Sequence, residues 1–164
     1  MGGSISLGGD IRKLTGHMRK LKNISFAATN EVLAQIARTS TRDRFREQKA
    51  PDGKAWIPSI RVKEEGGVTL TQTSRLKNSI RAKSDDTGFA VGTNVIYARR
   101  HQLGDKKAVL IKAKKKRGLR FQVGGRWITK GSVKVKIPAR PFLGISEDDL
   151  LEIKATLEEM VSNG

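Results

Sequence analysis

The chain has 164 residues, no cysteine and a formal net charge of +17. This length suits one domain, 1–164, in which 1–9 form a flexible, Gly-rich N-terminus. The lack of cysteine excludes disulfides and thiolate metal sites, and the apolar runs are too short to cross a bilayer, so we expect no membrane partner. The excess of positive charge predicts contact with nucleic acid, an anionic surface or an acidic protein.

Two helices are predicted between residues 10 and 46, because apolar residues recur there every three or four positions. The first carries Leu14, Met18 and Leu21, and the second carries Ala28, Val32, Ile36 and Ala37. Asn23 or Ser25 can cap the second helix, which should end near Gln48 because Pro51 and an Asp-Gly turn follow. We expect Phe45, Trp56 and Ile57 to hold this turn against the core.

The rest of the chain predicts strands and a final helix. Residues 75–94 indicate a short helix or extended start and then a β-hairpin, and residues 95–104 indicate a helical turn that ends at Gly104. Antiparallel strands are expected in 108–113, 119–123 and 126–137, since apolar and polar residues alternate in 132–137 and glycines lie at the joints. An amphipathic helix capped by Ser146 should cover about 147–161. The fold class is α+β, with N-terminal helices and a C-terminal helix packed on an antiparallel β-sheet that carries a long basic hairpin.

Residues that could carry chemistry are scattered. His17 and His101 lie far apart, and neither has a second histidine at ligand spacing. No serine has a nucleophile-elbow pattern, and the neighbours of His101 are Arg99, Arg100 and Gln102 rather than an orienting carboxylate, so it should cap or hydrogen-bond its own loop. We therefore expect no catalytic, metal or cofactor site.

The stretch KAKKKRGLR, residues 112–120, is the strongest candidate for a binding surface. Read as the tip of a hairpin, it places several cations within reach of a phosphate backbone or of an acidic partner. These are Lys112, Lys114, Lys115, Lys116, Arg117 and Arg120. Phe121 and Trp127 are nearby, but in alternating strands we expect them to face the core, so contact with nucleic acid should be sequence-blind.

The stretch KIPARPFLGIS, residues 136–146, is a stiff connector, because Pro138 and Pro141 fix two backbone angles. A pre-ordered segment that offers Arg140, Phe142 and Leu143 suits a subunit interface, since ordering lowers the entropic cost of association. The alternative is that Phe142 and Leu143 close the core beneath the last helix. Both interpretations stay open for different side chains.

Four stretches, taken in order, resemble the virion morphogenesis or tail completion proteins of Mu- and P2-type tailed phages. They are TRDRFREQKAPDGKAWIPS, LTQTSRLKNSI, VGTNVIYARRHQLG and IPARPFLGIS. Two positions depart from the pattern: Ser74 stands where glycine is usual, and Arg99-Arg100 replace a small or apolar pair.

The resemblance implies a structural protein without catalysis, made in the bacterial host cytoplasm and placed at the tail or neck of the virion. Such proteins form a homo-oligomeric ring, taken to be six-fold, that completes the tail tube or joins it to the head. The implied partners are tail-tube and neck or head-connector proteins, with nonspecific contact to the passing DNA. The alternative is a small basic nucleic-acid-binding protein without sequence specificity, which the net charge favours.

Overall fold

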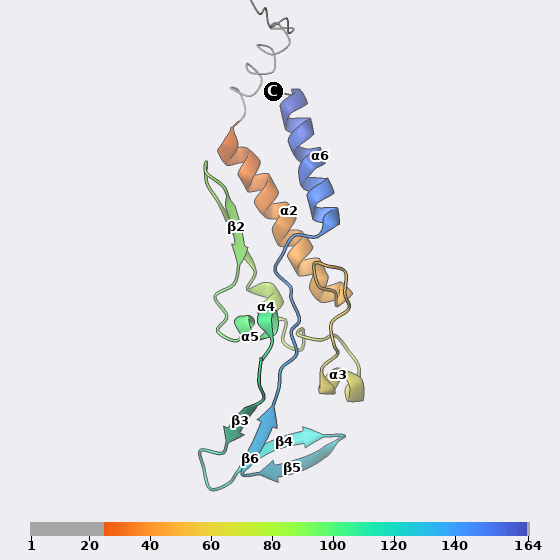
Figure 1. The fold of residues 1–164 in the computed structure, drawn as a ribbon, viewed down its shortest axis with the longest axis vertical. Helices are drawn as coiled ribbons and strands as arrows, with labels where there is room; N and C mark the ends of the chain where they lie inside the picture. Colours follow the sequence, from red (N-terminus) through yellow and green to blue (C-terminus); the bar gives the residue numbers. More distant parts are fainter. Residues whose placement is uncertain (1–24, 164) are drawn as a thin grey trace, which may run out of the picture.

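The structure is a computed structural model that describes residues 25–163. The described part is elongated, with α2 (Phe26–Glu47) and α6 (Glu147–Asn163) side by side at one end and four short strands at the other (Figure 1). The predicted flexible segment 1–9 and the predicted first helix lie outside the described residues. Helices combined with antiparallel strand pairs confirm the α+β class.

Helix α2 begins and ends where the sequence predicts. The Ser25 hydroxyl accepts a hydrogen bond from the amide of Ala28 at 3.3 Å, which satisfies a donor that the first turn leaves unpaired. At the other end Gln48 adopts φ 60° and donates its amide to the carbonyl oxygen of Arg44. The Gln48 side chain then bonds the backbone of Thr69, which ties the helix end to a distant loop.

The hydrophobic core lies where this helix end meets the segment before α6. Phe45, Trp56 and Phe142 form an aromatic cluster, with ring centroids 5.4 Å apart for Phe45 and Trp56 and 5.3 Å for Phe45 and Phe142. Around it pack other buried apolar side chains: Ala50, Leu76, Ile80 and Ala98. The predicted packing of Phe45 and Trp56 is confirmed. The prediction for Ile57 is wrong, since this residue is 56% exposed and its carbonyl oxygen accepts a hydrogen bond from Arg140.

Two short helices flank the core. Helix α3 (Ile60–Glu65), capped by the Ser59 hydroxyl, was not predicted, because it is only 6 residues long and none of its residues is buried. Helix α4 (Arg75–Asn78) buries Leu76 and is preceded by Ser74 at φ 52°. This left-handed backbone suits glycine, which is the residue that the family resemblance leads one to expect there.

The predicted β-hairpin is present and packs along α2. Strand β1 (Arg81–Ser84) pairs with β2 (Phe89–Gly92) in antiparallel register, and the turn is fixed by the Asp85 carboxylate, which accepts from the amides of Thr87 and Gly88. Helix α5 (Ala98–Leu103) follows and ends at Gly104, as predicted.

The four remaining strands differ from the prediction of one continuous sheet. Strand β3 (Val109–Lys112) pairs with β6 (Ser132–Val135), and β4 (Leu119–Val123) pairs with β5 (Arg126–Lys130). Together with β1 and β2, the strands of the described residues thus form three separate two-stranded sheets. The predicted hairpin between 108–113 and 119–123 is wrong, because β3 takes its partner from later in the chain.

Candidate functional site

The four strands project from the rest of the protein as a unit that we call the basic tip, residues 105–137; residues 25–104 and 138–163 are called the body. In Figure 1 two extended segments connect the tip to the body. The two segments are bonded where they leave the body: the Asp105 amide donates to the Ile137 carbonyl oxygen at 2.8 Å, and the Ile137 amide donates to the Asp105 carboxylate at 3.1 Å. The tip is therefore held at both of its ends.

Inside the basic tip the lysine-rich loop connects two sheets rather than closing a hairpin. It runs from the end of β3 to the start of β4, and the amide of Gly118 donates to the Lys115 carbonyl oxygen at 3.0 Å. The actual hairpin turn is Gly124-Gly125, with φ values of 53° and 75° that glycine adopts without strain. The Gly124 amide also donates to the Glu64 carboxylate of α3 at 2.9 Å, which ties this hairpin to the body.

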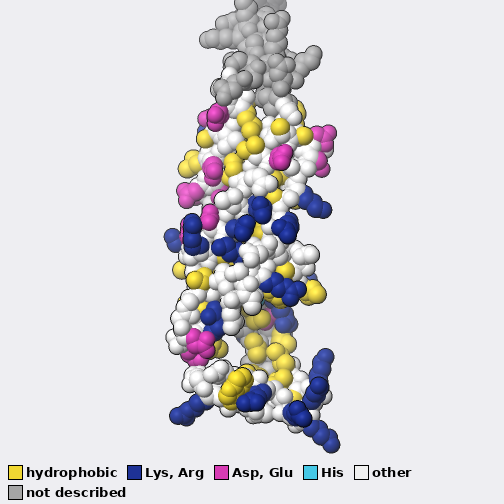
Figure 2. All heavy atoms as spheres, turned by 180° about the vertical axis from the view of Figure 1, so that it is seen from behind, with side chains coloured by type: hydrophobic (Ala, Val, Ile, Leu, Met, Phe, Trp, Pro, Cys, Tyr) yellow, Lys and Arg dark blue, Asp and Glu magenta, His cyan; other side chains and the backbone are white. Residues whose placement is uncertain are grey.

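Positive charge is concentrated in the basic tip. Residues 105–136 hold 12 of the 33 lysines and arginines of the chain, and Asp105 is their single acidic residue. Within the described part of the chain, the ion pair of the tip joins Asp105 to Arg100 of the body at 3.7 Å. All six predicted contact residues are exposed: Lys112, Lys114, Lys115, Lys116, Arg117 and Arg120. Figure 2 shows blue side chains spread around this end of the molecule.

The tip also exposes apolar surface that the sequence did not predict. Trp127 is 61% exposed, and the guanidinium of Arg120 lies 4.5 Å from its ring centroid. The prediction that Trp127 faces the core is wrong, whereas Phe121 is half-buried. Strand β3 is exposed along its whole length, including the apolar side chains Val109, Leu110 and Ile111. Two-stranded sheets have too little depth to bury both of their faces.

The connector with two prolines is held by the body on several sides. The Arg140 Nε donates to the Ile57 carbonyl oxygen at 2.7 Å, and the Trp56 Nε1 donates to the Pro141 carbonyl oxygen at 2.8 Å. The Gln102 side chain oxygen accepts from the amides of Phe142 and Leu143, each at 3.0 Å. From Pro138 onward the connector is thus packed into the body within a single chain.

The five predicted interface residues of the connector differ in solvent exposure. Phe142 is fully buried and Leu143 packs against the core cluster, which favours the interpretation that these two close the core. Arg140 is 5% exposed, whereas Pro138, Pro141 and Leu143 are half-buried. An interface role stays a prediction for them.

A buried ion pair joins α2 to α6. Arg44 contacts the Asp149 carboxylate, and its Nη1 donates to the carbonyl oxygens of Phe142 at 3.1 Å and Gly144 at 2.7 Å. Asp149 also accepts from the Ser146 amide, while its own amide donates to the Ser146 hydroxyl. This reciprocal pair is a capping box and confirms Ser146 as the cap. Burial raises the pKa of Asp149, but bonds from Ser146 and Ser40 and the charge of Arg44 bring that pKa below its ordinary value.

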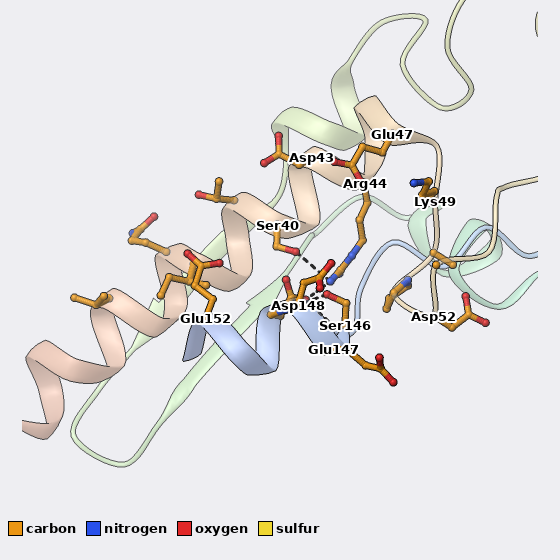
Figure 3. Close-up of a pocket in the computed structure, with 18 of the residues that line it drawn as sticks. Ser40, Asp43, Arg44, Glu47, Lys49, Asp52, Ser146, Glu147, Asp148 and Glu152 are labelled. Atoms are coloured by element: carbon orange, nitrogen blue, oxygen red, sulfur yellow. Dashed lines mark hydrogen bonds and ion pairs between the residues drawn. The ribbon is translucent and has the colours of Figure 1, made fainter. Parts of the chain in front are cut away.

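Beside this ion pair a groove of about 1240 Å³ runs between α2, the turn at 49–53 and the start of α6. Figure 3 shows carboxylates from both helices around it. Eight of the 16 acidic residues of the chain line this groove: Glu31, Asp43, Glu47, Asp52, Glu147, Asp148, Asp149 and Glu152. We call it the acidic groove; it was not predicted, because its residues come from two distant parts of the sequence.

His101 does not bond its own loop as predicted. Its Nδ1 is buried without a hydrogen-bond partner in the described structure, and its ring packs edge-on against Tyr97 with centroids 5.9 Å apart. Burial and the nearby charge of Arg140 lower the pKa of His101, although Asp105 acts in the opposite direction. His101 thus belongs to the packing between α5 and the connector, whose Arg140 amide donates to the His101 carbonyl oxygen.

Among residues 25–163, which the structure describes, no three histidine or acidic side chains gather closely enough to hold a metal ion. None of the described helices is both long and apolar enough to cross a membrane.

The sequence profile of the phage virion morphogenesis family matches residues 10–162, nearly the whole chain. The chain belongs to the phage virion morphogenesis family. Comparisons with the curated proteins and with the solved structures each found no match. Membership in the phage virion morphogenesis family, which is a structural phage family, indicates a role in building the phage particle.

Proposed function

We propose that the protein is a structural subunit that assembles into a homo-oligomeric, six-fold ring, completes the tail tube or joins the tail to the head, and carries out no catalysis. The observation that carries this proposal is the family match over residues 10–162, together with a basic tip that projects from a well-packed body. The partners in this proposal are the tail tube and the neck or head-connector proteins. The place of action is the tail or neck of the virion.

The basic tip supports this role through its charge. A genome that passes through a ring meets a channel wall or rim, and exposed cations interact with phosphates of any sequence. In the proposal, the cations of the lysine-rich loop line this passage or contact an acidic partner. The half-buried Pro138, Pro141 and Leu143 supply outward contacts of the connector, while Arg140 and Phe142 fix it to the body.

A second candidate function is nonspecific binding of nucleic acid outside a virion. The specific observation in its favour is the exposed Trp127 beside Arg120, because an aromatic ring and a cation on one surface can stack on unpaired bases. The acidic groove counts against a purely nucleic-acid-binding protein, since its eight carboxylates repel a phosphate backbone.

Genetic complementation tests the first proposal. Phage made without this gene should accumulate heads with absent or unfinished tails, and the wild-type chain supplied in trans should restore joined particles, as counted in electron micrographs. Normal tails in the absence of the gene would overturn the proposal. Sedimentation velocity combined with micrographs of the purified protein measures the ring directly.

The DNA contact is tested separately by salt titration. Replacing Lys114, Lys115 and Lys116 with Gln should reduce the slope of log affinity against log salt by about 1 for each phosphate that the loop no longer neutralises. The matched control replaces three exposed cations of the body, Lys63, Arg81 and Lys83. An unchanged slope in the loop variant would remove the loop from DNA binding.

A further inference from the structure

The basic tip and the acidic groove carry opposite charges and lie on different parts of an elongated molecule. The groove follows α2 and the start of α6, whereas the tip forms the other end of the longest axis (Figure 1). On the face seen in Figure 2, acidic side chains gather mainly over the α2 and α6 end, and basic ones occupy the tip and the middle of the molecule. Because of this separation, the tip of a chain does not reach the groove of the same chain.

The acidic groove has both charge and apolar surface to offer a partner. Half of the acidic residues of the whole chain line this groove, together with two basic residues, Arg44 and Lys49. Of these two, Arg44 already forms an ion pair with Asp149. The carboxylates of Glu31, Glu47 and Glu152 belong to exposed residues. Between the acids the groove is lined by apolar side chains: Ala28, Val32, Ile36, Ala50 and Pro51. Such a lining suits an occupant that is cationic and partly apolar.

The basic tip has these two properties. Its six exposed cations from Lys112 to Arg120 lie beside the exposed apolar side chains of β3 and beside Trp127. Within the described residues, none of these six cations takes part in an ion pair. The tip therefore keeps its charge available for a partner, and the apolar surface next to it adds area that association would remove from water.

We propose that the basic tip of one copy docks into the acidic groove of a second copy. This inference rests on the proposed function, for which it names the contact between neighbouring subunits. The contact is head-to-tail, because it joins two different surfaces, and each bound copy leaves one free tip and one free groove. Repetition of such a contact gives a ring when the rotation between copies closes and a filament when it does not.

Charge reversal in the full-length chain tests the docking. The tip variant carries Lys114→Glu, Lys115→Glu and Lys116→Glu, and the groove variant carries Glu31→Lys, Glu47→Lys and Glu152→Lys; all six positions are exposed, so both variants should fold. Each variant alone should lose self-association by roughly 100-fold or more in sedimentation velocity at low salt, since like charges then face each other. The control, Lys63→Glu with Arg81→Glu and Lys83→Glu, changes the net charge as much as the tip variant does and should associate like the wild type.

Mixing the two variants gives the sharpest outcome. The groove variant keeps a basic tip that fits the unchanged groove of the tip variant, and the reversed tip fits the reversed groove. An equimolar mixture should therefore recover the assembly that neither variant forms alone. Recovery would exclude misfolding as the cause of the loss in the single variants.

Other outcomes overturn the inference. These are a wild type that stays monomeric at all concentrations, variants that still assemble, or a mixture that does not recover. If the tip variant loses binding to a fluorescent DNA duplex but keeps self-association, the tip is a nucleic-acid surface instead. Complementation with the tip and groove variants separates the two proposals. Variants that assemble and still restore tails would contradict the docking alone. Normal tails in phage that lack the gene would contradict the proposed function.

Discussion

In the body, Phe45, Trp56 and Phe142 are buried against one another, whereas in the basic tip Trp127 is 61% exposed and its ring faces the guanidinium of Arg120. The body also buries a salt bridge and contains a capping box, while the tip consists of two pairs of strands joined by turns and loops. Stability therefore comes mainly from the body, and the side chains of the tip are available to partners. Substitutions in the body should therefore lower the free energy of unfolding, whereas substitutions in the tip should change the contacts with partners.

The largest contrast is expected between Phe142→Ala and Trp127→Ala. Phe142 is fully buried in the core cluster, so its truncation should lower the free energy of unfolding by about 4 kcal/mol. Trp127→Ala removes an exposed ring and should lower it by less than about 1 kcal/mol. Urea unfolding of both variants measures the difference, and equal losses would mean that the tip is as important to stability as the core.

The next effect concerns the ion pair between the helices. Arg44→Met should lower the free energy of unfolding by about 3 kcal/mol, because Asp149 then stays buried without its charged partner. The loss stays near the lower end of the usual range since the Ser146 amide still donates to the carboxylate. The exposed pair Lys154 and Glu158 supplies the control, as Lys154→Met should cost less than about 1 kcal/mol. A small loss for Arg44→Met would contradict its role in docking α6.

A smaller effect is expected at the junction between body and tip. Gly104 has φ 68°, and a Cβ added there would lie 2.6 Å from the Ala139 amide nitrogen, so Gly104→Ala should cost about 2 kcal/mol. Gly88→Ala is the matched control, because it has neither a positive φ nor an atom within 4 Å. Hydrogen exchange of the tip amides would show whether the strain spreads beyond the junction. Equal stability of the two variants would argue against close packing there.

The smallest effect is expected on the free energy of unfolding at low pH. Because the pKa of Asp149 is lower in the folded chain, its ionised form contributes stability that is complete above the unfolded pKa of about 3.9 and is lost as pH falls through the folded pKa. In Asp149→Asn this part of the pH dependence should be missing, although the variant is less stable at neutral pH. Urea unfolding from about pH 7 to about pH 3 measures it. Identical pH dependence in both proteins would contradict the assignment to Asp149.

Local signals predicted α2, α5, α6 and the first hairpin. Ser25 and Ser146 are caps, and Pro51 and Gly104 follow helices as breakers, so the elements they bound could be located from neighbouring residues. Helix α3 was not predicted, because it has 6 residues and none of them is buried, so the sequence shows no periodic apolar pattern there.

Pairing across long stretches of sequence could not be predicted. The apolar run of β3 and the alternation in β6 are the same whichever strand each one pairs with, so the prediction that β3 pairs with the nearest strand is wrong. The cations of the tip were predicted from composition, whereas the acidic groove was not, because it forms only when α6 folds back onto α2. Phe142 and Leu143 leave two interpretations open in the sequence, and the burial of Phe142 and the packing of Leu143 against the core cluster favour the core.

The bonded pair of Asp105 and Ile137 has a consequence for how this protein can vary. The chain leaves the body and returns to it at nearly the same point, so residues 106–136 form a cassette with adjacent ends. An insertion at such a point leaves the packing of the host intact. Related chains could therefore lengthen, shorten or exchange this cassette, while the body and its helix pair keep the same packing.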